Sequence, residues 1–117
     1  MQKSTRIYRT IVLLASGLVE LSVAIIMAFK PEIFLKELTG EETRLAHSFG
    51  VGALAIGLLS LLLIRFRSKE VSIAGLTVLT VYHAGIGIVQ HEMIAAIIFH
   101  SWLVLSFIFL LVRTVKE

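Results

Sequence analysis

The chain has 117 residues, of which 57% are hydrophobic and only 16% charged, with a formal net charge of +3. Soluble domains carry about 25% charged residues, so this composition indicates a single-domain membrane protein. The chain has no cysteine, which excludes disulfide exchange, iron–sulfur ligation and thiolate zinc sites. Its basic residues lie at the ends of apolar stretches and not in a stripe, so no nucleic-acid partner is expected.

Four nearly charge-free stretches predict four transmembrane helices, at about 11–29, 45–64, 71–90 and 93–112. A helix needs about 20 apolar residues to cross a hydrocarbon layer about 30 Å thick, and each stretch is that long. The first stretch ends without a small-residue cleavage site, so we interpret it as a retained helix and not a signal peptide. Short later connections predict an all-α, antiparallel four-helix membrane bundle ordered up-down-up-down.

The first connection carries its own pattern. Pro31 suits the first turn of a helix, Glu32 complements the helix dipole and Gly40 can close the end. This predicts a short interfacial helix between the first two spans, with an ordinary ordered loop as the alternative. Thr39 and Glu42 fit a capping box that begins the second span.

The distribution of basic residues predicts the orientation. In a four-span chain, one side of the membrane has eight Lys and Arg residues: Lys3, Arg6, Arg9, Arg65, Arg67, Lys69, Arg113 and Lys116. Because cytoplasmic loops are enriched in Lys and Arg, both termini are expected to be cytoplasmic, in a bacterial-type cytoplasmic (inner) membrane.

Small residues recur at helical spacing and predict the packed faces. Because apolar helices gain little hydrophobic drive in lipid, close approach through small side chains matters. The second span has the stripe Ala46, Gly50, Ala53, Gly57 and Ser60. The first span offers Ser16, Gly17, Glu20 and Ala24, and the third offers Thr80, His83, Ala84, Gly87 and Gln90.

Four ionisable side chains lie within or near the ends of the spans, one in each: Glu20, His47, His83 and His100. Ionisable groups in a bilayer are costly and usually face a partner, a cavity or a ligand. At 1.5 Å per residue, His83 and His100 lie about 10 Å below the outer ends of their spans, and Glu20 about 14 Å. His47 lies only about 3 Å deep by the same count. Glu20, His83 and His100 thus predict a polar pocket in the outer half of the bundle, with His47, Arg44 and Gln90 above it.

Several chemistries remain open for that pocket. His83 and His100, on adjacent spans, could hold a metal ion or a haem iron. Glu20 and the histidines could form a pathway for protons or for a solute. A lipid-like or quinone ligand could bind to Glu20, His83 or His100, and Trp102 and Tyr82 lie close to these histidines in the sequence. Finally, the polar side chains could simply hydrogen-bond across helices and fix the assembly.

Enzymatic activity is not indicated by the residues present. The chain has no Asp, and so no Ser–His–Asp set, and it has no phosphate-binding glycine loop. We therefore expect no stand-alone catalytic activity.

Four short segments and one histidine form a recognisable set: Gly17-Leu-Val-Glu20, Pro31-Glu-Ile-Phe-Leu35, Ala46-His-Ser-Phe-Gly50, Ala53-Leu-Ala-Ile-Gly57-Leu-Leu59 and His83. This set resembles the DoxX-like group of small four-helix membrane proteins, in particular the relatives called domain of unknown function 4345. That family often has an arginine just before the Phe-Gly pair, where this chain has His47 and Ser48. The resemblance covers roughly residues 8–113. It implies an antiparallel four-helix membrane fold and, for some relatives, association with quinone-linked respiratory or sulfur-oxidising complexes.

Together these observations predict a small polytopic membrane protein that is a ligand-binding or accessory subunit of a quinone-linked redox system. The alternatives are a small oligomeric transporter or proton-coupled channel, and a purely structural membrane partner. The expected surroundings are the lipid bilayer, with a homo-oligomer or a larger membrane complex as open alternatives.

Overall fold

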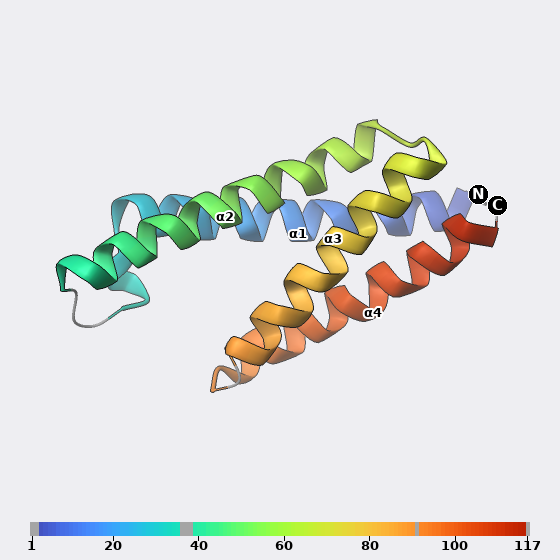
Figure 1. The fold of residues 1–117 in the computed structure, drawn as a ribbon. Coiled ribbons are helices and arrows are strands. Elements are labelled where there is room, and N and C mark those ends of the chain that lie inside the picture. The colour runs from blue at the N-terminus through green and yellow to red at the C-terminus, as the bar shows by residue number, and fades with distance from the viewer. Residues whose placement is uncertain (1–2, 36–38, 91, 117) are drawn as a thin grey trace.

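The computed structural model describes residues 3–35, 39–90 and 92–116, and four long helices account for most of them (Figure 1). They are α1 (Lys3–Phe29), α2 (Gly40–Arg65), α3 (Lys69–Val89) and α4 (Ile94–Lys116). Each is long and apolar enough to cross a membrane, which confirms the prediction of an all-α membrane bundle. Helix α1 begins well before the predicted span, because the polar residues that precede the apolar stretch continue the same helix.

The connection between α1 and α2 contains a short helix, as predicted. Its described part has one turn of 3₁₀-helix, η1 (Pro31–Ile33), with Pro31 in its first turn. Residues 36–38 of the predicted helix lie outside the described residues. Gly40 does not end a short helix but is the first residue of α2. The reason is the capping box, which is confirmed: Glu42 N donates to Thr39 Oγ1, and Thr39 N donates to Glu42 Oε2 at 2.7 Å.

The bundle consists of two helical hairpins. Helix α1 packs along α2, and α3 packs along α4, whereas contacts between the two pairs are far fewer. Figure 1 shows both termini at one end of the molecule, where the hairpins meet, and shows the hairpins diverging toward the other end. We call these the closed end and the open end. Consecutive helices run antiparallel, so the order is up-down-up-down.

Small residues bring α1 and α2 together, as the spacing predicts. All five members of the α2 stripe are buried, and so are Ser16, Gly17, Glu20 and Ala24 of α1. Gly17 and Gly57 face each other where the helices approach. A Cβ on Gly57 would lie only 3.2 Å from the Gly17 carbonyl oxygen and 2.9 Å from Leu21 Cγ. The close contact of the two backbones therefore depends on glycine.

An apolar core joins the hairpins toward the closed end. Its buried members are Val12, Leu13, Leu63, Leu76, Leu79, Leu103, Phe107 and Leu110. One turn beyond this core, Arg9 is also buried, and its Nη2 donates to Leu63 O at 2.9 Å and to Ser72 Oγ at 3.0 Å. The sequence analysis counted Arg9 only in the charge bias. In the structure it binds the last turn of α2 and the start of α3 to α1.

The outside of the bundle is covered by large apolar side chains. Ile25, Val81 and Leu105 are each more than half exposed, and every long helix contributes others. Soluble proteins rarely expose continuous apolar surface of this extent, whereas lipid requires it. The chain is an integral membrane protein surrounded by lipid.

A buried Glu–His–His cluster beside a cavity

Glu20 of α1, His83 of α3 and His100 of α4 meet at the base of the open end. His83 Nδ1 lies 2.9 Å from His100 Nδ1 and 3.7 Å from Glu20 Oε1. One ligand atom from each of the three side chains lies within 4.8 Å of the other two. The side chains are almost fully buried, with exposed fractions of 3% for Glu20, 0% for His83 and 6% for His100. We call these three residues the Glu–His–His cluster.

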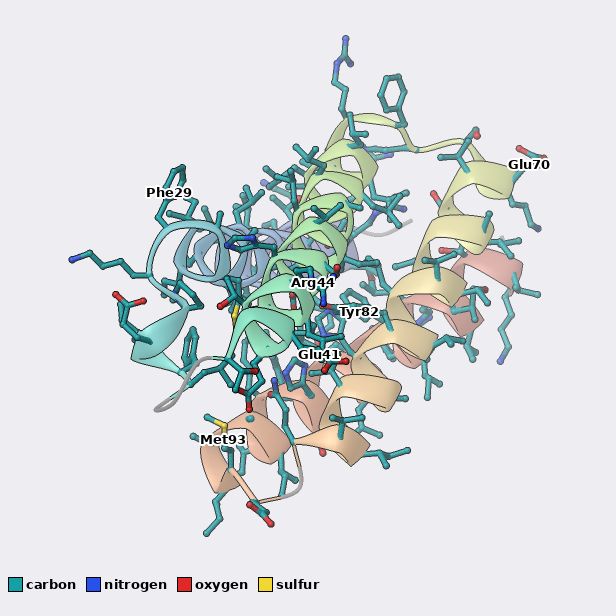
Figure 2. All side chains as sticks on the ribbon, turned by 60° about the vertical axis from the view of Figure 1, so that its left-hand side comes forward. Phe29, Glu41, Arg44, Glu70, Tyr82 and Met93 are labelled. Carbon is teal, nitrogen blue, oxygen red and sulfur yellow. The ribbon has the colours of Figure 1, made fainter. Side chains whose placement is uncertain are left out.

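Further polar side chains hold the cluster. The Tyr82 hydroxyl donates to Glu20 Oε2 at 3.0 Å, and Figure 2 shows Tyr82 on the side of α3 that faces α1 and α2. His83 Nε2 lies 3.1 Å from Ser16 Oγ, which in turn lies 2.9 Å from Ser60 Oγ. The Ser60 hydroxyl donates to Ile56 O at 3.0 Å. All four helices thus contribute to one hydrogen-bonded network.

Aromatic rings enclose the two imidazoles. The rings of His83 and His100 stack, with centroids 5.1 Å apart and an interplanar angle of 30°. Phe107 lies 5.6 Å from His83, and Phe99 meets His100 edge-on at 5.5 Å. Rings packed on both sides leave each imidazole little freedom to rotate, so the nitrogen positions are well defined.

A cavity of about 540 Å³ lies between the hairpins and reaches the cluster. Its polar residues are Glu20, Gln90 and His100, and no Lys or Arg lines it among the described residues. Apolar side chains make up the remaining walls: Val19, Val23, Met27, Ile33, Phe34, Leu35, Phe49, Ile86, Met93, Ala96 and Phe99. All four helices and the η1 segment contribute, so this cavity is a property of the whole fold.

The other residues that the sequence singled out lie elsewhere, except Gln90. His47 is exposed and borders a different groove, about 350 Å³ in volume, between α1 and α2. Arg44 is exposed on the first turns of α2 (Figure 2) and does not line the cavity. Trp102 is 38% exposed and contacts the ring of Phe99 from outside the cavity. Residue counting gives a depth along a helix but not a direction around it, which is why His47 and Arg44 do not form the expected rim.

Ser16, Ser60 and Tyr82 belong to the network although the sequence analysis did not name them as site residues. A signal for Ser16 existed, because it lies one helical turn before Glu20 on the same small-residue face. Ser60 likewise ends the α2 stripe. Tyr82 was noted only as the sequence neighbour of His83; its hydrogen bond to Glu20 was not predictable, because Glu20 is 62 positions away in the chain.

Comparison with known proteins found no matching family model, no matching curated protein and no matching solved structure. Fold and site therefore define the class of protein by themselves. It is a four-helix integral membrane protein with a buried Glu–His–His cluster at the end of an apolar cavity.

Proposed function

We propose that this protein binds a neutral, membrane-dissolved molecule with a polar head, of the quinone type, in the cavity between the hairpins. In this proposal it acts as a ligand-binding or accessory subunit of a membrane redox system. The observation that carries the proposal is the cavity itself: apolar walls with Glu20, His100 and Gln90 as polar contacts. Small-molecule sites commonly combine an apolar lining with a few polar groups that orient the ligand.

The apolar walls favour a ligand that partitions into lipid. At about 540 Å³, the cavity lies within the range of about 300–1,000 Å³ that small-molecule sites occupy. Phe34, Phe49 and Phe99 offer flat apolar surfaces for a ring. The volume suits one substituted ring with the beginning of an apolar tail.

The polar contacts favour an uncharged head. A phosphate or carboxylate would face the Glu20 carboxyl, with no Lys or Arg among the described lining residues to balance it, and burying such like charges is unfavourable. Imidazole and amide N–H groups can instead donate to a carbonyl oxygen. Gln90 is the donor available to a quinone carbonyl, and His100 is a second polar contact for the head group.

The assignment to the quinone class is supported by the resemblance to DoxX-like proteins, some of which associate with quinone-linked complexes. It also fits the residues, because a cavity whose described lining has polar contacts but no nucleophile–base set suits binding more than catalysis. The proposal includes a bacterial-type cytoplasmic membrane with the open end on the non-cytoplasmic side.

Proton passage is the second candidate function, and a structural feature makes it less favoured than ligand binding. The network runs from His100 through His83 and Ser16 to Ser60. Toward the closed end, Val12, Leu13 and Leu63 are packed into the apolar core and no more than 1% exposed. A proton path through one copy of the chain would have to cross that core.

The test uses the single tryptophan of the chain. Trp102 contacts Phe99, which lines the cavity, so a bound quinone should quench its fluorescence. We expect saturable quenching by a short-chain benzoquinone in lipid nanodiscs with a chelator present. His100→Ala should weaken binding about 10-fold, equivalent to about 1.4 kcal/mol, whereas His47→Ala should not. Quenching that never saturates, or that is equal in all three proteins, contradicts the proposal.

A further inference from the structure

We infer that Glu20, His83 and His100 form a binding site for one divalent transition-metal ion. This inference goes beyond the proposed function and does not rest on it, since the ion would bind whether or not the cavity holds a quinone. It rests on the distances within the cluster, the direction of the hydrogen bonds around it and its charge.

The distances suit a shared ion. Metal–nitrogen and metal–oxygen bonds of about 2.1 Å at tetrahedral angles place neighbouring ligand atoms about 3.4 Å apart. His83 Nδ1 lies 2.9 Å from His100 Nδ1 and 3.7 Å from Glu20 Oε1, on either side of that value. The ligand atoms of Glu20 and His100 lie within 4.8 Å of each other, so binding one ion would draw these two side chains closer together. The three ligands come from three helices and are already buried.

The hydrogen bonds indicate which nitrogen of His83 carries the proton. The Ser60 hydroxyl has one proton, and it is donated to Ile56 O. With that proton directed to Ile56 O, Ser16 donates its own proton to Ser60. His83 Nε2, 3.1 Å from Ser16 Oγ, is then the donor to Ser16. A neutral His83 with its proton on Nε2 has its lone pair on Nδ1, where it accepts a hydrogen bond from His100 Nδ1; a metal ion would take the place of that shared proton, which would move to His100 Nε2.

This arrangement is the one that metal-binding histidines adopt. A ligating imidazole usually donates its other N–H to a neighbouring oxygen, which fixes the ring and its tautomer. Ser16 is in that position for His83. Tyr82 has the matching role for the carboxylate, because it donates to Glu20 Oε2 and leaves Oε1 directed toward His83.

The charge also favours a cation. Glu20 is 3% exposed, and no described Lys or Arg lines the cavity that it borders. An anionic carboxylate buried without a counter-charge is costly, and a divalent ion bonded to it would supply that charge.

The ligand set narrows the choice of ion. Two imidazoles and one carboxylate suit zinc, iron, manganese or cobalt, whereas Mg²⁺ and Ca²⁺ prefer oxygen ligands. Three protein ligands leave at least one position for another molecule. Glu20 and His100 both line the cavity, so that position would face it.

The experiment is a cobalt titration of the purified full chain in detergent, after chelator treatment and without quinone. We expect one Co²⁺ per chain, with the visible absorption of a nitrogen- and oxygen-ligated ion and displacement by Zn²⁺. His83→Ala, His100→Ala and Glu20→Gln should each weaken binding about 100-fold or more, and Ser16→Ala about 10-fold. His47→Ala is the matched control and should bind as the unmodified chain does.

Wild-type protein that binds no cobalt, or an H47A variant that loses as much affinity as H83A, overturns the inference. If an alanine variant fails to fold, X-ray absorption of the zinc-loaded unmodified chain decides: two imidazole ligands support the site and none overturns it. Ile33→Phe separates the two proposals, because it adds bulk to the cavity wall from η1, an element that contributes no residue to the cluster. It should abolish saturable quinone quenching and retain cobalt binding, so each proposal can fail without the other.

Discussion

The Tyr82 hydroxyl of α3 donates a 3.0 Å hydrogen bond to Glu20 Oε2 of α1, and so connects the two hairpins at the base of the cavity. On the next residue of α3, His83 faces His100 of α4. Two consecutive residues of one helix thus bind the first helix and the last. This places α3 at the centre of the polar network.

We predict that Tyr82→Phe lowers the free energy of unfolding by about 0.5–1.5 kcal/mol, as loss of one hydrogen bond between membrane helices does. It should also weaken cobalt binding about 10-fold, because the Glu20 carboxylate loses its orienting donor. Tyr8→Phe is the matched control, since it removes a 2.7 Å bond between Tyr8 of α1 and Ser106 of α4, remote from the cluster. The assignment is supported if the two variants lose similar stability and only Y82F loses cobalt affinity. Equal cobalt affinity in both variants contradicts it.

Gly57→Ala should destabilise the α1–α2 hairpin. The added methyl would lie 3.2 Å from a backbone oxygen of Gly17, which cannot move without separating the helices. We expect a loss of about 1–3 kcal/mol, typical of overpacking, in reversible unfolding in mixed micelles. Gly52→Ala, on the same helix, meets nothing within 4 Å and should be neutral or slightly stabilising, because alanine favours helix over glycine. A loss in G52A as large as in G57A would show that helix packing is not the cause.

Arg9→Met should cost about 2–3 kcal/mol of unfolding free energy. Methionine keeps much of the side-chain volume but removes charged hydrogen bonds to Leu63 O and Ser72 Oγ. Arg6→Met is the control, because this substitution removes the same formal charge from a side chain that is exposed. The comparison, made by unfolding both variants in the same detergent, separates the role of Arg9 in packing from the charge bias that both residues share. Equal stability of the two variants would show that Arg9 contributes to the charge bias but not to packing.

The predicted orientation is tested by cysteine accessibility. Because the chain has no cysteine, single-cysteine variants have no background. In intact bacterial cells, Glu41→Cys at the open end should react with a membrane-impermeant maleimide, whereas Ser4→Cys near the amino terminus should react only after permeabilisation. The reverse pattern would place both termini, and the eight Lys and Arg residues on the same side of the membrane, outside the cell.

The helices and their packed faces were predictable from sequence because both depend on local patterns. Apolar stretches of span length predict the four helices, and small residues at helical spacing predict the buried stripe that includes Gly50 and Gly57. Thr39 and Glu42 predict the start of α2 by direct hydrogen bonding within one turn. Each of these features involves residues close together in the chain.

Features that depend on direction around a helix, or on distant partners, were not predictable. Glu20, His83 and His100 share a depth that counting can find, but their meeting depends on how α1, α3 and α4 rotate against one another. His47 shows the limit of residue counting, because it lies near the same end of the bundle but borders a separate groove. Arg9 shows it too, because its partners on α2 and α3 lie 54 and 63 positions away.

The division into two hairpins has a consequence for biosynthesis. The α1–α2 hairpin is complete once the first 65 residues have been made, and it can pack as soon as it enters the membrane. The cluster cannot form at that stage, because it needs His83 of α3 and His100 of α4. Glu20 therefore enters the membrane before its histidine partners exist. Co-translational assembly ends, not begins, with the site, so a chain that stops after α2 would hold an inserted hairpin whose Glu20 carboxyl group lacks its partners Tyr82 and His83.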